Sequence, residues 1–211
     1  AVDLPGHGRS EGPALDSIEA IADWVARLTG ALDGSAHLVG HSMGALVALD
    51  TAARHPGAVA SAVLLGVATA MPVHPELQAA ADIDDPKAAA LIAAWAHGPR
   101  QHIGLNPTPG LWMLGGVTAL LETSPPGVLA TDLAACSAYE GATSSAASSA
   151  CPVTLVLGSQ DRMSPRKAAR TLEDAFVSPP TIVELEASGH MLMLEEPEAV
   201  RQAILTHLDA C

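Results

Sequence analysis

Length, composition and charge restrict the classes of protein to which this chain can belong. Its 211 residues fit one domain, whose core we expect to consist of Ala, Leu and Val, because 49% of the residues are hydrophobic and only 2% are aromatic. The formal net charge of −13 argues against binding nucleic acid or an anionic membrane through a basic surface. No run approaches the roughly 18 apolar residues of a membrane span and no signal-type segment opens the chain, so we expect a cytoplasmic protein.

The first third of the chain predicts a strand, a turn and a helix around one serine. Residues 1–10 look like the tail of a strand that breaks into a Gly/Pro loop, and a helix is predicted over 15–28. The apolar run at 36–39 predicts a strand and residues 45–54 a helix. Between them lies the pentapeptide Gly40-His41-Ser42-Met43-Gly44.

This pentapeptide makes Ser42 a candidate nucleophile. A serine at a sharp turn between a strand and a helix has its hydroxyl exposed above the edge of a sheet. Glycines on either side remove Cβ atoms that would collide with the helix and the neighbouring strand. Since G-x-S-x-G also recurs by chance around ordinary turn serines, the assignment depends on a base and an acid that follow in the right order.

Later apolar runs of strand length alternate with helices and predict a doubly wound α/β fold with a parallel sheet. The predicted strands cover residues 61–66, 153–157 and 181–185, and the helices cover 165–175 and 197–208.

The stretch from 71 to 150 interrupts this alternation. We interpret it as a helical lid inserted over the carboxyl edge of the sheet, where ligands of open α/β sheets bind. Its Ser/Ala-rich end, residues 142–150, is predicted to be a flexible connector. The α/β core then comprises residues 1–70 and 151–211, and the helices of the lid are predicted at 85–97, 110–121 and 126–139.

Two further strands end in residues that complete a catalytic set. Asp161 follows the strand that ends at 157, although a turn or capping aspartate is the alternative interpretation, and Gly189-His190 follows the strand that ends at 185. The order Ser, Asp, His is the one used on the α/β-hydrolase fold. In this scheme His190 accepts the proton of Ser42, Asp161 fixes the tautomer of His190, and Ser42 attacks a carbonyl carbon.

On these motifs the chain resembles the α/β-hydrolase fold superfamily in its esterase-like branch, which uses a serine nucleophile. Residues 3–10 add the loop pattern D-x-P-G-x-G-x-S, and the turn at 158–161 also fits. A serine at the elbow argues against the dehalogenase and epoxide hydrolase branches, which use aspartate there. Glu140 and Asp132 remain distant alternatives to Asp161 as the acid.

The resemblance also implies an oxyanion hole. One donor would be the backbone N–H of Met43, and the other would come from a loop after the third strand of the family, which lies upstream of residue 1. We therefore expect the chain to be an amino-terminally truncated piece of a longer hydrolase. Its sheet would then lack its N-terminal strands, and the strand before Ser42 would be an unpaired edge.

Substrate contacts are assigned to His41, His102, Trp112 and Met191, and the expected partner is a small ester-type molecule. The odd number of cysteines, the absence of C-x-x-C spacing and the scattered histidines predict neither a metal ion nor a cofactor.

The leading hypothesis is a hydrolase of carboxylic esters or thioesters. An acyltransferase, a carbon–carbon bond hydrolase and a perhydrolase remain open within the same fold, as does a non-catalytic ligand-binding protein or an inactive fragment.

Overall fold

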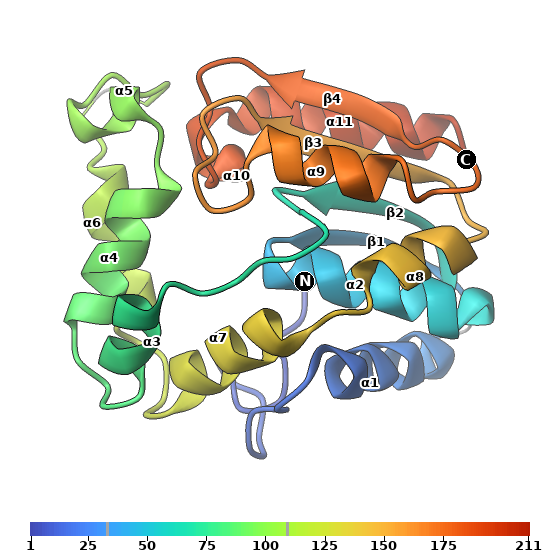
Figure 1. Ribbon diagram of the computed structural model, residues 1–211, viewed down its shortest axis with the longest axis horizontal. Coiled ribbons are helices and arrows are strands. Elements are labelled where there is room, and N and C mark those ends of the chain that lie inside the picture. The colour runs from blue at the N-terminus through green and yellow to red at the C-terminus, as the bar shows by residue number, and fades with distance from the viewer. Residues whose placement is uncertain (33, 109) are drawn as a thin grey trace.

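The computed structural model describes residues 1–32, 34–108 and 110–211, and a parallel sheet lies at its centre (Figure 1). Each described strand coincides with a predicted apolar run, so the predicted α/β fold is confirmed. Residues 1–4, predicted as the tail of a strand, have no regular secondary structure. In spatial order the described strands are β1 (Ala36–His41), β2 (Val59–Leu65), β3 (Val153–Gly158) and β4 (Thr181–Leu185).

Helices cover both faces of this sheet, which explains why its strands are continuously apolar. Leu64 and Leu155 face one layer of helices, whereas Val63 and Val156 face the other. The first layer contains α1 (Ile18–Ala31), α2 (Met43–Arg54), α8 (Ala142–Ser148) and α9 (Arg166–Glu173), and the second contains α10 (Leu192–Glu195) and α11 (Pro197–Asp209) (Figure 1).

Local sequence signals determine where these helices begin. Ser17 caps α1, because its hydroxyl oxygen accepts a hydrogen bond from the backbone N–H of Ala20 at 3.2 Å. Ile18 and Ile21 then share the buried face of α1. At the end of α2, His55 and the short 3₁₀ turn η1 (Pro56–Ala58) lead the chain into β2.

A group of helices between β2 and β3 stands beside the sheet, and we call it the cap. Leu77, Ile92 and Ala96 form an apolar cluster inside it, against which Met163 and Met191 of the sheet loops pack. No helix among the described residues is long and apolar enough to cross a membrane. The cap comprises α3 (Pro75–Ala81), α4 (Lys87–Ala96), α5 (Pro99–His102), α6 (Met113–Leu121) and α7 (Val128–Ala138). Figure 1 shows α3 to α6 of this group at the left and α7 below the sheet.

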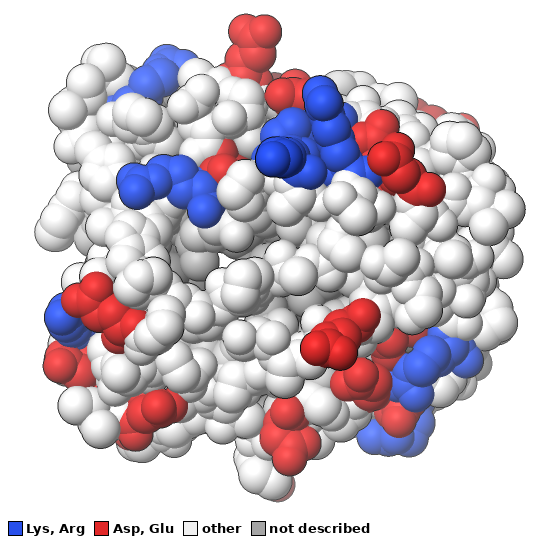
Figure 2. Space-filling view, viewed as in Figure 1, with Lys and Arg blue, Asp and Glu red and all other residues white. Residues whose placement is uncertain are grey.

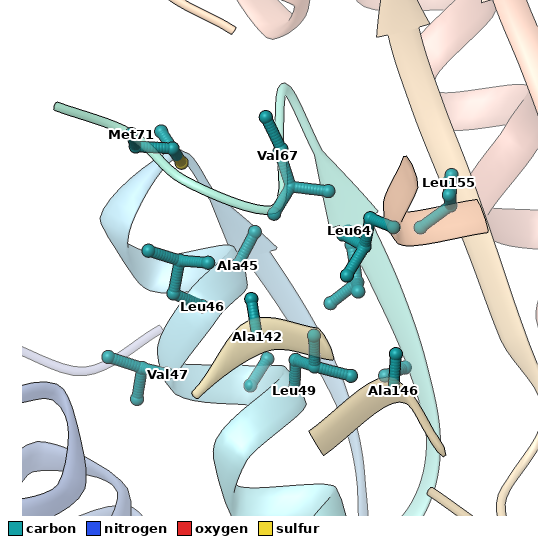
Figure 3. Packing of buried hydrophobic residues seen from close by; sticks show 14 of the residues in the cluster. Ala45, Leu46, Val47, Leu49, Leu64, Val67, Met71, Ala142, Ala146 and Leu155 are labelled. Atoms are coloured by element: carbon teal, nitrogen blue, oxygen red, sulfur yellow. The ribbon is translucent and has the colours of Figure 1, made fainter. Parts of the chain in front are cut away.

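The Ser/Ala-rich segment differs from its prediction as a flexible connector, because residues 142–148 form the helix α8. Its Ala142 and Ala146 are fully buried, and Figure 3 shows them beside Leu49 of α2. Small side chains allow the two helices to approach closely and to bury this face. The end of the predicted lid therefore packs with the sheet domain.

On the face shown in Figure 2, charged side chains lie in small groups, several of which contain both acidic and basic residues, with uncharged surface between them. Ion pairs of the protein include Arg54 with Asp23 at 2.7 Å and Arg166 with Glu173 at 2.9 Å.

Candidate active site

Ser42 lies at a strained turn between β1 and α2. Its backbone has φ 55° and ψ −121°, a conformation that non-glycine residues rarely adopt. The Ser42 N–H donates to the carbonyl oxygen of Leu65 at 2.9 Å, which fixes the turn to the end of β2. A Cβ atom on Gly40 would collide with the carbonyl group of Gly44, whereas one on Gly44 would meet nothing within 4 Å. Only the first glycine of the motif is therefore required for close packing.

Asp161 and His190 form a buried hydrogen-bonded pair at the same edge of the sheet. Asp161 Oδ2 lies 2.8 Å from His190 Nδ1, and the two side chains are 1% and 2% exposed. The N–H groups of Met163 and Ser164 each donate to Asp161 Oδ1 at 2.8 Å, and the Ser164 hydroxyl donates to Oδ2 at 2.6 Å. Burial alone would raise the pKa of Asp161, but the hydrogen bonds from His190 and Ser164 lower it overall, so the carboxylate form is favoured.

The second ring nitrogen of His190 is available for chemistry. Because Nδ1 faces the carboxylate, Nε2 is left as the basic nitrogen, and it is buried with no hydrogen-bond partner among the described residues. The hydroxyl of Ser42 is accordingly not hydrogen bonded to it. Gly66 makes room for this ring, since it has φ 57° and a Cβ there would lie 3.1 Å from His190 Nδ1.

His41 connects the turn at Ser42 with His190. Its Nε2 donates to the backbone carbonyl oxygen of His190 at 2.8 Å, and the centroids of the two rings are 4.7 Å apart. Burial and the adjacent His190 lower the pKa of His41 to about 4, so the ring is neutral at pH 7. The structure therefore places His41 as a support for His190.

A cavity of about 780 Å³ opens beside Ser42 and Met43, between the cap and the sheet. The backbone N–H of Met43, at the start of α2, has no acceptor among the described residues. Most side chains around the cavity are apolar. They include Met71, Pro72, Val73, Leu77, Trp95, Leu129, Leu133 and Met163, together with the polar residues His74, Asp132, Cys136 and Arg162.

Asp132 forms a hydrogen bond with His7 and none with His190. Its Oδ2 lies 2.7 Å from Nε2 of His7, and burial raises the pKa of Asp132 despite this hydrogen bond. Burial and the nearby Asp132 also raise the pKa of Cys136 to about 11, so this thiol is protonated at pH 7. Glu140 is exposed. The structure thus brings Asp161, and neither of the alternative acids, to His190.

None of the four predicted substrate contacts lines this cavity. Trp112 is 75% exposed and its ring lies against Gly115 of α6, the helix that begins at the next residue. His102 is exposed, Met191 packs into the apolar cluster of the cap, and His41 supports His190. Sequence reasoning missed Ser164 and the lining residues of α7. A helical spacing of three and four residues could have indicated this lining, because it places on one face of a helix the residues Leu129, Asp132, Leu133 and Cys136.

Solved structures with the same architecture are known. The enol-lactonase from Burkholderia xenovorans superposes with a TM-score of 0.85 over 98% of this chain and 79% of that protein, at 23% sequence identity. A thermophilic esterase from Thermogutta terrifontis gives a TM-score of 0.82 over 99% and 78% of the two chains, at 24% identity. At these identities the likeness concerns the fold.

Sequence comparison finds closer but shorter matches. A pimeloyl-acyl-carrier-protein methyl ester esterase from Methylococcus capsulatus is 50% identical over 64 residues, which are 30% of this chain and 24% of that protein. The matched part is thus about a quarter of that relative. A family model described as alpha/beta hydrolase family matches residues 1–203. The chain belongs to the alpha/beta hydrolase family.

Proposed function

We propose that this protein is a serine hydrolase that cleaves carboxylic esters or thioesters through Ser42, His190 and Asp161. The observation that carries the proposal is the strained backbone of Ser42 at the mouth of an apolar cavity, beside the buried Asp161–His190 pair. Strain of this kind persists where the surrounding structure holds a functional residue. The esterase activity named for the Methylococcus capsulatus relative supports the same conclusion.

The reaction has two halves. His190 Nε2 removes the hydroxyl proton of Ser42 as Oγ attacks the carbonyl carbon, and Asp161 stabilises the imidazolium that forms. Collapse of the tetrahedral intermediate breaks the bond to the alcohol or thiol, which leaves with the proton of His190. In the second half His190 takes a proton from water, whose oxygen attacks the acyl-enzyme, and Ser42 is released with its proton restored.

The backbone N–H of Met43 is proposed as one donor to the oxyanion. It lies at the amino end of α2, where N–H groups without intrahelical partners point outward. A donor so placed stabilises the charge that develops on the carbonyl oxygen in the transition state.

The cavity favours an aliphatic group on the substrate. Its lining is dominated by Met, Leu, Val and Pro side chains, and Trp95 is its one tryptophan among the described lining residues. Burial of methylene groups in such a cavity stabilises the complex by about 0.8 kcal/mol for each.

Covalent labelling tests this proposal. A fluorophosphonate probe is expected to label the protein at Ser42, and Ser42→Ala is expected to abolish the labelling. The protein should also hydrolyse p-nitrophenyl esters of aliphatic acids. Absence of both labelling and turnover would contradict the proposal and favour a non-catalytic ligand-binding role.

A further inference from the structure

The loop that carries His190 is joined to the cap by backbone hydrogen bonds. The carbonyl oxygen of Ala96, at the end of α4, accepts from the N–H of His190 at 2.6 Å and from that of Met191 at 3.1 Å. A Cβ atom on Gly189 would collide with the backbone N of Gly98, so the two segments are in direct contact. His190 is therefore positioned partly by the cap.

Glu195 of α10 completes this junction. Its side chain is fully buried, and Oε2 accepts one hydrogen bond from the N–H of Gly98 and one from that of Gly189, both at 3.0 Å. Among the described residues no Lys or Arg forms an ion pair with this carboxylate. A buried carboxylate is costly unless hydrogen bonds compensate it. Oε1 has no hydrogen-bond partner among the described residues, so the two N–H donors to Oε2, one from the cap and one from the histidine loop, are what hold this side chain.

A glycine at each donor position makes this bridge possible. A Cβ on Gly98 would lie 2.9 Å from Glu195 Oε2 and 3.0 Å from the carbonyl oxygen of Ala187, so a larger residue there would separate the carboxylate from its donor. The cap segment, the carboxylate and the loop before His190 thus fit together with no space for an additional methyl group.

The main chain and side chain of His190 are then held from three directions. Ala96 accepts from its N–H, His41 donates to its carbonyl oxygen, and Asp161 holds Nδ1. Its remaining polar atom, Nε2, has no partner among the described residues. A small shift of the loop would therefore change the distance of Nε2 from Ser42.

We propose that Glu195 is a positioning residue that connects the cap to the catalytic histidine loop and sets the reach of His190 Nε2 toward Ser42. The inference rests on the proposed function of Ser42 and His190, and it adds that the placement of the base depends on contact with the cap. A misplacement of about 1 Å in a catalytic group costs on the order of 100-fold in rate.

The test compares Glu195→Ala, Glu195→Gln and Glu196→Gln. Glutamine at 195 keeps one oxygen that can accept from both N–H groups, whereas alanine keeps none. Glu196, a half-buried neighbour whose side chain forms no hydrogen bond with the described residues, provides the same change of charge as a control. Measurements are the rate of fluorophosphonate labelling, kcat and KM on a p-nitrophenyl ester, thermal unfolding, and the downfield proton resonance of His190 Nδ1–H.

Glu195→Ala is expected to lower kcat and the labelling rate about 100-fold with little change in KM. Glu195→Gln should recover most of that loss, and Glu196→Gln should match the wild type. A lower melting temperature with unchanged kcat in Glu195→Ala would overturn the inference, because it would show a purely structural role. If Glu195→Ala does not fold, the folded Glu195→Gln variant decides. A labelling rate and an Nδ1–H resonance like those of the wild type would support the role of the oxygen. A labelling rate 100-fold lower would overturn it.

The resonance separates this inference from the proposed function. If the wild type labels at no serine, the proposed function fails, but the Nδ1–H signal still reports the geometry of the Asp161–His190 pair. Loss or broadening of that signal in Glu195→Ala would support the positioning role, and an unchanged signal would overturn it.

Discussion

In the proposed mechanism Asp161 determines which nitrogen of His190 carries the proton. In Asp161→Asn a carboxamide N–H would donate to Nδ1, so the ring proton would move to Nε2 and the base would be lost. We expect kcat to fall about 10⁴-fold with the fold retained. Steady-state kinetics on a p-nitrophenyl ester measure this.

Glu140→Gln is the control for this substitution. Glu140 was an alternative acid from sequence, and the structure places it on the surface. The Glu140→Gln variant should retain full activity on the same ester. A comparable loss of activity in both variants would contradict the assignment of Asp161.

His41 makes stability depend on pH. The folded protein keeps this ring neutral down to a pKa of about 4, whereas the unfolded chain protonates it below about 6.5. Between these values the unfolded state binds more protons, so the free energy of unfolding falls as pH falls. The loss of unfolding free energy begins as the pH falls below 6.5 and stops below about 4, where both states are protonated. Between these values the free energy of unfolding changes by at most about 1.4 kcal/mol per pH unit.

His41→Gln should flatten this dependence while it keeps a donor for the carbonyl oxygen of His190. Urea unfolding across the same pH range measures the slope. His102→Gln, which changes an exposed histidine, should leave the slope as in the wild type. Equal slopes in His41→Gln and the wild type would show that His41 does not carry the effect.

At the scale of elements, the two glycines of the serine motif have different roles. Gly40→Ala would force β1 and α2 apart, because the new methyl group collides with the carbonyl of Gly44. We expect a loss of about 1–3 kcal/mol in the free energy of unfolding from this overpacking. Gly44→Ala meets nothing within 4 Å and replaces a helical glycine, so stability should stay equal or rise by up to about 1 kcal/mol. Chemical denaturation of both variants decides, and equal losses would contradict the packing argument.

Tyr139 attaches the end of α7 to the buried Asp50 of α2. Its hydroxyl donates to Asp50 Oδ1 at 2.8 Å, where Ser145 of α8 is a second, longer donor at 3.3 Å. Arg54 Nε donates to Asp50 Oδ2 at 2.7 Å, and Tyr139 is the closer of the two donors to Oδ1. Tyr139→Phe removes this donor from a buried carboxylate and should destabilise the protein by about 1–3 kcal/mol. Ser144→Ala, an exposed change on α8, should alter stability by less than about 0.5 kcal/mol in the same unfolding assay. An unchanged unfolding midpoint in Tyr139→Phe would show that the hydrogen bond to Asp50 does not stabilise the protein.

The same elements show what sequence can predict. Every described strand was predicted, because a strand covered on both faces is a short apolar run between turn residues. Helix α8 was not, since Ser and Ala are equally typical of linkers. Its helical state depends on burial of Ala142 and Ala146 against α2, a tertiary contact that local composition does not encode.

At the scale of the whole molecule, the candidate triad was predictable and the substrate cavity was not. Ser42, Asp161 and His190 follow strand ends, and parallel strands bring their carboxyl ends to one edge. The cavity depends on how the cap folds over that edge. Trp112 is conspicuous in the sequence, yet its ring lies against Gly115 and it does not line the cavity, whereas Trp95 does.

The cavity between cap and sheet should determine the preferred length of the acyl chain. In the wild type kcat/KM should rise from acetyl to hexanoyl p-nitrophenyl esters by up to about fourfold per methylene, which corresponds to about 0.8 kcal/mol each. Leu129 of α7 lines this space, so Leu129→Trp should shorten it and lower kcat/KM for the hexanoyl ester much more than for the acetyl ester. Leu120→Trp, at a side chain that is 70% exposed on α6, should preserve the wild-type profile. A hexanoyl-to-acetyl ratio unchanged by Leu129→Trp would mean that the acyl chain binds elsewhere.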